Sequence, residues 1–93
     1  MQAMSAARAN LRFNRALYEL MREREIQRKL IQTGKVPYDL ADSEVPRLAK
    51  LATLAEELGE VARDILDAND TAKLRHELVQ LATLTAAWIE SEL

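Results

Sequence analysis

Apolar residues recur at intervals of three and four through most of the chain, which is the spacing of one face of an α-helix. On this spacing we predict a first helix over about residues 5–32, a second from residue 42 or 43 to about 68, and a third from about residue 72 onward. The chain has only two glycines and two prolines, and β-branched residues hardly alternate with polar ones, so strands are not expected. The pattern predicts one all-α domain over residues 1–93.

Two breaks separate the predicted helices. Gly34 and Pro37 both interrupt helical geometry after the first helix. Pro46 then fits the first turn of the second helix, where its missing N–H group is not needed. The second break is Asn69-Asp70-Thr71, a short connection of residues that commonly cap helices. A connection this short favours antiparallel packing of the second and third helices.

The second predicted helix is divided into an apolar and an acidic side. The apolar stripe consists of Leu51, Leu54, Ala55, Leu58, Val61, Ala62 and Ile65. Five carboxylates lie opposite it, at Glu56, Glu57, Glu60, Asp64 and Asp67. Like charges four residues apart, as in Glu56/Glu60 and Glu60/Asp64, are each unfavourable by about 0.2–0.5 kcal/mol. We therefore expect a cation against this side, with a hard divalent metal ion as the first candidate. The alternative is an ordinary solvated acidic face.

The third predicted helix is apolar on all sides between Leu78 and Ile89, where no residue is charged. Such a helix is buried on more than one side, and two other helices of the same chain give it few neighbours. A chain of 93 residues also buries only about 60–65% of its unfolded surface. We therefore expect a helical bundle that is completed by oligomerisation.

Charge is distributed unevenly along the chain. Residues 1–35 hold eight Lys and Arg against three Glu, a net charge of +5, whereas residues 36–93 hold five against twelve acids, a net charge of −7. The basic helix could bind nucleic acid, but the acidic part would repel the same polymer and no recognition motif is present, so this is the least favoured function.

Cysteine is absent, the N-terminus has no apolar signal segment, and the longest uncharged stretch is the twelve residues 78–89. A disulfide framework and a thiolate site are therefore excluded, and no segment reaches the length of a membrane span. We expect a cytoplasmic protein without a membrane partner.

Four oxygen-bearing side chains could meet between the last two helices. Glu57 and Glu60 are three residues apart, as are Glu77 and Gln80 in the third helix, so each pair lies on one helix face. If the helices pack antiparallel, the four side chains can converge. Carboxylate and carbonyl oxygens suit Mg²⁺, with Mn²⁺ as an alternative.

Those same residues carry a resemblance to a known family. Glu56-Glu57-Leu58-Gly59-Glu60 followed by Glu77-Leu78-Val79-Gln80 resembles the paired EExxE and ExxD motifs of MazG-type nucleoside triphosphate pyrophosphohydrolases. Residues 54–62 and 74–82 are similar to the small, single-domain members. Glu23-Arg24-Glu25-Ile26-Gln27 resembles a Glu- and Arg-rich segment of their first helix. The likeness covers roughly residues 20–90.

The resemblance implies an all-α protein that forms a dimer or a dimer of dimers. It also implies Mg²⁺-dependent cleavage of a (d)NTP to (d)NMP and pyrophosphate, a reaction that clears nucleotides from the pool. Glu57, Glu60 and Glu77 would be catalytic metal-binding acids, with Glu56 in a supporting role.

One position departs from the family pattern, because Gln80 stands where the family has Asp. An amide can coordinate through its oxygen, but it brings no charge. Metal affinity could therefore be weaker, or the task could pass to Asp64 or Asp67. The chain could also be a non-catalytic helical module whose acidic face docks a basic partner.

Substrate contacts are predicted outside the acidic motifs. Arg24, Arg28 and Lys29 could hold phosphates, although solvated helix positions are the alternative for each. Tyr38 lies in the Gly/Pro break and could stack on a base. A Gly-rich phosphate loop is absent, so metal and side chains would have to bind the phosphates.

Overall fold

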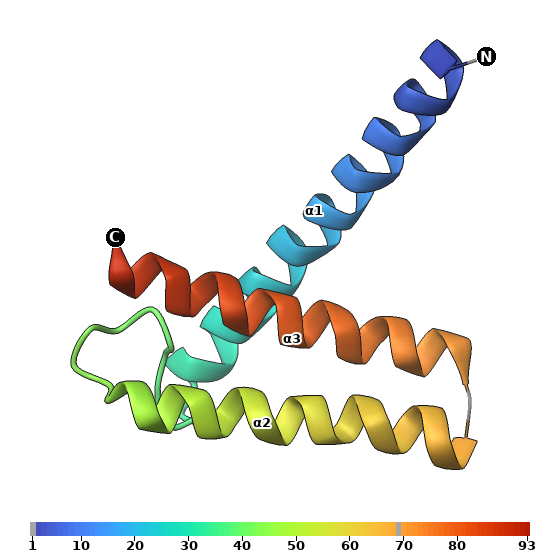
Figure 1. The fold of residues 1–93 in the computed structure, drawn as a ribbon. Helices are drawn as coiled ribbons and strands as arrows, with labels where there is room; N and C mark the ends of the chain where they lie inside the picture. Colours follow the sequence, from blue (N-terminus) through green and yellow to red (C-terminus); the bar gives the residue numbers. More distant parts are fainter. Residues whose placement is uncertain (1, 69) are drawn as a thin grey trace.

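The computed structural model describes residues 2–68 and 70–93, with side chains for residues 5–67 and 70–93. It contains three α-helices, α1 (Gln2–Gln32), α2 (Arg47–Arg63) and α3 (Thr71–Glu92), and a π-helical turn η1 (Asp64–Ala68) that continues α2 (Figure 1). No strand occurs among the described residues, so the predicted all-α class is confirmed. Asn69, part of the predicted connection, lies outside the described residues. None of the described helices is long and apolar enough to cross a bilayer.

Helix α3 is the centre of the fold. Helix α2 lies alongside it in the opposite direction, and α1 crosses it at a steep angle, with the N-terminal half of α1 extending away from the other two helices (Figure 1). Within the described residues, α1 and α2 each pack on α3 and make no close backbone contact with one another. The radius of gyration is 15.3 Å, against roughly 12 Å for a compact domain of this length. The difference reflects the extended part of α1.

Helix α1 ends at Gln32, as the sequence predicts, and Gly34 follows two residues later. The glycine has φ of +75°, a left-handed conformation that a residue without a Cβ adopts at little cost. This conformation turns the chain so that the amide of Gly34 donates to the carbonyl of Ile31 and that of Lys35 to Leu30. These bonds satisfy two carbonyls at the end of the helix.

Helix α2 begins at Arg47, later than the predicted start at Asp42 or Ser43. Pro46 is the N-cap residue and so lies just before the first helical residue. The proline ring disfavours helical geometry at Val45, so the helix cannot extend back past this point. The side chain of Asp42 instead accepts a hydrogen bond of 2.9 Å from the amide of Glu44 in a separate turn. The predicted position of Pro46 inside the first turn was therefore wrong by one residue.

The junction between α2 and α3 differs from prediction in one respect. The sequence predicted one regular helix to Ala68, but its last five residues widen into the π-helical η1. Helix α3 then starts with Asp70 as its N-cap, whose carboxylate accepts from the amides of Ala72 (3.0 Å) and Lys73 (3.2 Å). Asp70 therefore has the capping role expected from the sequence.

The apolar core of the single chain is small. Among the described side chains, Leu40, Val61 and Ala87 are the buried apolar ones. Part of the predicted apolar stripe of α2 lies on the outer side of the helix, because Leu51, Leu58 and Ile65 expose 51–57% of their surface. Leu48, which precedes the stripe, is 77% exposed. The crossing of α1 over α3 occurs at small residues, with Thr83 and Ala87 each 1% exposed.

Polar contacts hold the loop and the helix ends together. The guanidinium of Arg24 on α1 lies 3.0 Å from Asp39 in the loop and 3.0 Å from Glu90 near the end of α3. Arg47 at the start of α2 donates two hydrogen bonds of 2.7 Å to Glu92. These contacts fasten the loop between α1 and α2 (residues 33–46) against the C-terminal end of α3.

Candidate metal site and adjoining cavity

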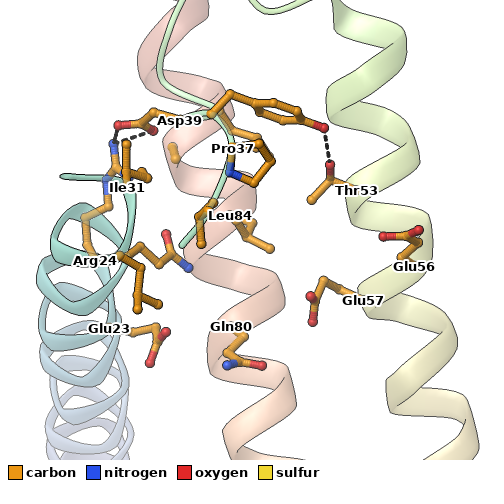
Figure 2. A pocket seen from close by; sticks show the side chains of 16 residues that line it. Glu23, Arg24, Ile31, Pro37, Asp39, Thr53, Glu56, Glu57, Gln80 and Leu84 are labelled. Atoms are coloured by element: carbon orange, nitrogen blue, oxygen red, sulfur yellow. Dashed lines mark hydrogen bonds and ion pairs between the residues drawn. The ribbon is translucent and has the colours of Figure 1, made fainter. Parts of the chain in front are cut away.

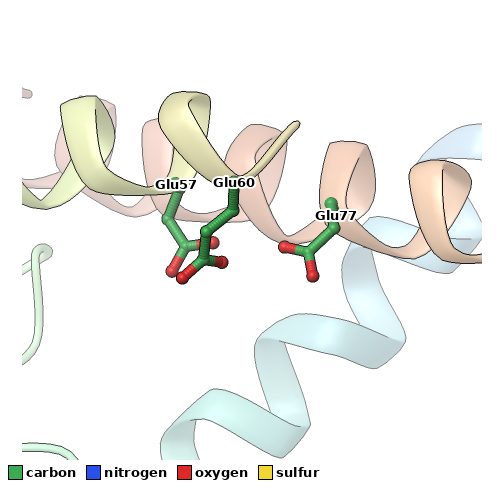
Figure 3. Close-up of side chains that lie close together, drawn as sticks. All are labelled: Glu57, Glu60 and Glu77. Carbon is green, nitrogen blue, oxygen red and sulfur yellow. The ribbon is translucent and has the colours of Figure 1, made fainter. Parts of the chain in front are cut away.

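Three carboxylates from two helices meet between α2 and α3. Glu57 and Glu60 lie one turn apart on α2, and Glu77 reaches toward them from α3 (Figure 3). One oxygen atom from each of the three lies within 4.8 Å of the others. The antiparallel pairing of α2 with α3 across their short connection produces this arrangement, as the sequence predicted for Glu57, Glu60 and Glu77. We call these three residues the carboxylate triad.

The electrostatics of the triad favour the arrival of a positive charge. Burial raises the pKa of Glu57 to about 7, and the negative charges of Glu60 and Glu77 add to this rise. The pKa of Glu77 is also raised, first by burial and then by Glu60 and Asp64. The Oε2 atoms of Glu57 and Glu77 are both buried without a hydrogen-bond partner. A cation between the carboxylates would reverse each of these unfavourable effects.

Asp64 lies beside the triad, at the start of η1. It is 6% exposed, and its charge is close enough to raise the pKa of Glu77. One of its oxygens lies 3.3 Å from the ammonium group of Lys73, while Oδ2 is buried without a partner. Asp64 therefore brings a fourth carboxylate to this region. Asp67, the other reserve candidate, is exposed.

A cavity of about 310 Å³ adjoins the triad at Glu57. It lies between the C-terminal half of α1, the loop, α2 and α3, in the space left because α1 and α2 do not touch. Figure 2 shows Pro37 and Asp39 of the loop at its upper end and Glu23, Gln80 and Glu57 at its lower end, each from a different helix. Glu56, the first acid of the motif, also lines this cavity.

Gln80, on α3, lies between α1 and α2 (Figure 2). It is half-buried, one turn beyond Glu77 on α3, and lines the cavity together with Glu57 and Glu23. The amide is next to the triad, in the region that the resemblance assigns to a fourth ligand.

Of the four predicted substrate contacts, two line the cavity and two do not. Tyr38 lines the cavity, and its hydroxyl is 3.1 Å from the hydroxyl of Thr53. Arg24 also lines it, but its terminal nitrogen already contacts two carboxylates. Arg28 lies 3.7 Å from Glu90 on the far side of α1, and Lys29 is exposed. Arg28 and Lys29 are not among the residues that line the cavity.

Sequence reasoning missed Glu23 and Gln27, two polar residues of α1 that line the cavity. The pattern contained a signal, because Leu20, Glu23, Gln27 and Leu30 follow the three-four-three spacing of one helix face. Polar residues on a face that otherwise packs inward mark a candidate binding surface.

Comparison of the chain with protein-family profiles, with curated proteins and with solved structures gave no match.

Proposed function

We propose that the chain is a Mg²⁺-dependent nucleotide pyrophosphohydrolase of the MazG type, which converts a (d)NTP and water to a (d)NMP and pyrophosphate. The observation that supports this best is the meeting of Glu57, Glu60 and Glu77 from two helices at the edge of a cavity. A triad of this kind suits phosphate chemistry, and the cavity offers room for the rest of a nucleotide.

The three residues fit a Mg²⁺ ion in donor type and spacing. Oxygen ligands at about 2.1 Å from one ion are at most roughly 4.2 Å apart, so the triad, within 4.8 Å, needs only small side-chain movements to close. The unpartnered Oε2 atoms of Glu57 and Glu77 are available as ligands. Mn²⁺ has the same ligand preference and would be accepted as well.

The chain's own residues would position the reacting groups. When bound, Mg²⁺ would neutralise phosphate charge and favour attack by water at the α-phosphorus, with pyrophosphate as the leaving group. Glu57, Glu60 and Glu77 would hold the ion, and Gln80 would offer its amide oxygen beside them. Asp64 would supply the negative charge that Gln80 lacks, because it lies next to Glu77.

A nucleotide panel with and without Mg²⁺, assayed for pyrophosphate release, tests this function. Glu57→Gln and Glu60→Gln should each lower the rate by at least about a hundredfold, with helix content unchanged by circular dichroism. Asp67→Asn, which removes an exposed acid two turns beyond Glu60, should retain the wild-type rate. Absence of pyrophosphate release from every nucleotide with either ion would refute the enzyme and favour the non-catalytic module.

We further propose that the working protein contains a second copy of the chain. An exposed apolar row runs along the outer side of α2 and η1, formed by Leu48, Leu51, Leu58 and Ile65. Only three of the described apolar side chains are buried. The spacing of this row, with Ala55 and Ala62 between its members, is the three-four repeat of helices that pack in pairs. A symmetric partner would cover this row and supply the core that one chain lacks.

A further inference from the structure

Two polar side chains of α1 that line the cavity have carboxyl or amide oxygens without a partner among the described residues. Glu23 is only 7% exposed and lines the cavity near Gln80 and Glu57 (Figure 2). In the part of the chain that the structure describes, no hydrogen bond or ion pair reaches its carboxyl group. Oε1 of Gln27, which lines the same cavity, is also buried without a partner. Buried acceptors are normally paired, so the unpaired Gln27 oxygen and the unpartnered Glu23 carboxyl group beside the cavity point to a ligand that brings donors.

Glu23 and Gln27 line the cavity from the same face of α1. They are four residues apart on α1, so their side chains emerge from one face on successive turns. Both groups can accept hydrogen bonds through oxygen. A ligand group with two N–H bonds in one plane could donate one to each.

The charge of the cavity indicates which part of a nucleotide it can take. Glu23, Asp39, Glu56 and Glu57 line it, against the single cation Arg24, which is already paired with Asp39. Phosphate groups would be repelled by this excess of negative charge. The uncharged end of the nucleotide is therefore the part that belongs in the cavity, with the phosphates outside it at the triad.

The size and walls of the cavity fit one flat ring system. Its volume of about 310 Å³ is at the lower end of the range for ligand pockets. Apolar side chains form much of its wall, namely Leu30, Ile31, Val36, Pro37 and Leu84. Largely apolar walls with a few well-placed polar groups are typical of sites that bind small organic ligands, heteroaromatic rings among them.

We propose that this cavity binds the nucleobase and selects bases that carry an exocyclic amino group, through Glu23 and Gln27. An amino group has two N–H donors, one for each acceptor, whereas uracil and thymine offer a single ring N–H flanked by carbonyl oxygens. Those carbonyl oxygens would face Glu23 and leave its acceptors unpaired. The inference rests on the proposed function for the placement of the phosphates at the triad.

Cytosine and uracil nucleotides provide the test, because they differ only in the amino or carbonyl group at C4 and the proton on N3. We would measure the Kd of non-hydrolysable α,β-methylene analogues of CTP and UTP by calorimetry with Mg²⁺. Wild-type protein should bind the cytosine analogue about tenfold or more tightly than the uracil analogue. Glu23→Gln keeps the size of the side chain but lets an amide rotate to suit either base, so the ratio should fall to near one. Glu25→Gln, an exposed acid on the same helix, should preserve the ratio.

The outcomes separate this inference from the proposed function. Equal affinity of the wild-type protein for both analogues overturns the base selection, and so does binding of neither analogue. An equal loss of the affinity ratio in Glu23→Gln and Glu25→Gln overturns it as well. Pyrophosphate release at equal efficiency from CTP and UTP overturns the selection and leaves the hydrolase in place. Tighter binding of the cytosine analogue that depends on Glu23, without any pyrophosphate release, supports the selection and refutes the hydrolase. The ratio of the wild-type Kd values for the two analogues needs no variant, so it tests the base selection even if Glu23→Gln fails to fold.

Discussion

Glu57→Gln should make the metal-free protein more stable at pH 8 and remove its response to Mg²⁺. The pKa of Glu57 is raised from 4.5 to about 7 in the folded chain. A group with a raised folded pKa contributes stability that is fully present below its unfolded pKa and is lost as pH rises through the folded value. The metal-free wild type should therefore lose stability between pH 4.5 and about pH 7, and the neutral amide should not.

The size of the effect follows from linkage. A shift from 4.5 to about 7 corresponds to at most roughly 3.4 kcal/mol at 1.36 kcal/mol per unit. Glu57 is only half-buried, so solvent screening reduces this to about 1–2 kcal/mol. For a chain of this length, each kcal/mol shifts Tm by about 4–8 °C. With Mg²⁺ at about 100 times its Kd, the wild type should instead gain about 2.7 kcal/mol.

Thermal unfolding followed by circular dichroism, at pH 5 and pH 8 with EDTA or Mg²⁺, measures all of these quantities. Without metal, Glu57→Gln should melt above the wild type at pH 8 and close to it at pH 5. With Mg²⁺ the order at pH 8 should reverse. Asp67→Asn, which removes the charge of an exposed acid, should behave like the wild type. A variant that is less stable than the wild type at pH 8 in EDTA would show that the triad is not a site of repulsion.

Three further predictions concern the rest of the fold. Gly59→Ala should raise the free energy of unfolding by about 0.5–1 kcal/mol, because the added methyl group meets no atom within 4 Å and alanine favours a helix interior; a lower Tm would show that the position is crowded. Asp39→Ala should cost about 1–3 kcal/mol in urea unfolding, because it removes the contact with Arg24 and a hydrogen bond from the amide of Ala41, whereas Asp42→Ala should cost less. Leu58→Glu, at a position that is 57% exposed, should shift the sedimentation of an oligomer to that of the monomer while helix content is kept; a wild type that already sediments as a monomer would refute the second copy.

Apolar spacing was enough to predict the number and type of the helices and the position of the triad. Glu57, Glu60 and Glu77 could be placed together because the connection at residues 69–71 leaves α2 and α3 little choice except antiparallel packing. The end of α1 just before Gly34 was equally local, because it depends on one residue with positive φ. Such features follow from a few neighbouring residues.

Features that depend on distant contacts could not be predicted. The sequence shows that Leu51 and Leu58 share a helix face, but not that this face points outward in a single chain. Likewise, Arg24 could equally bind a phosphate or a carboxylate, until the loop places Asp39 beside it. The cavity itself arises because α1 and α2 pack on α3 without meeting, which no local pattern encodes.

Because α3 is central, the two parts of the candidate site are built from different helices of the chain. The triad lies wholly within the hairpin of α2 and α3, whose ends are joined by a few residues, whereas the cavity wall also needs α1 from the other end of the chain. Contacts close in sequence form with little loss of loop entropy, so the hairpin should assemble early in folding and α1 should dock later. Affinity for the ion should then appear before affinity for a base as the chain folds. Substitutions in α1 should accordingly be able to change the choice of base while leaving the ion site intact.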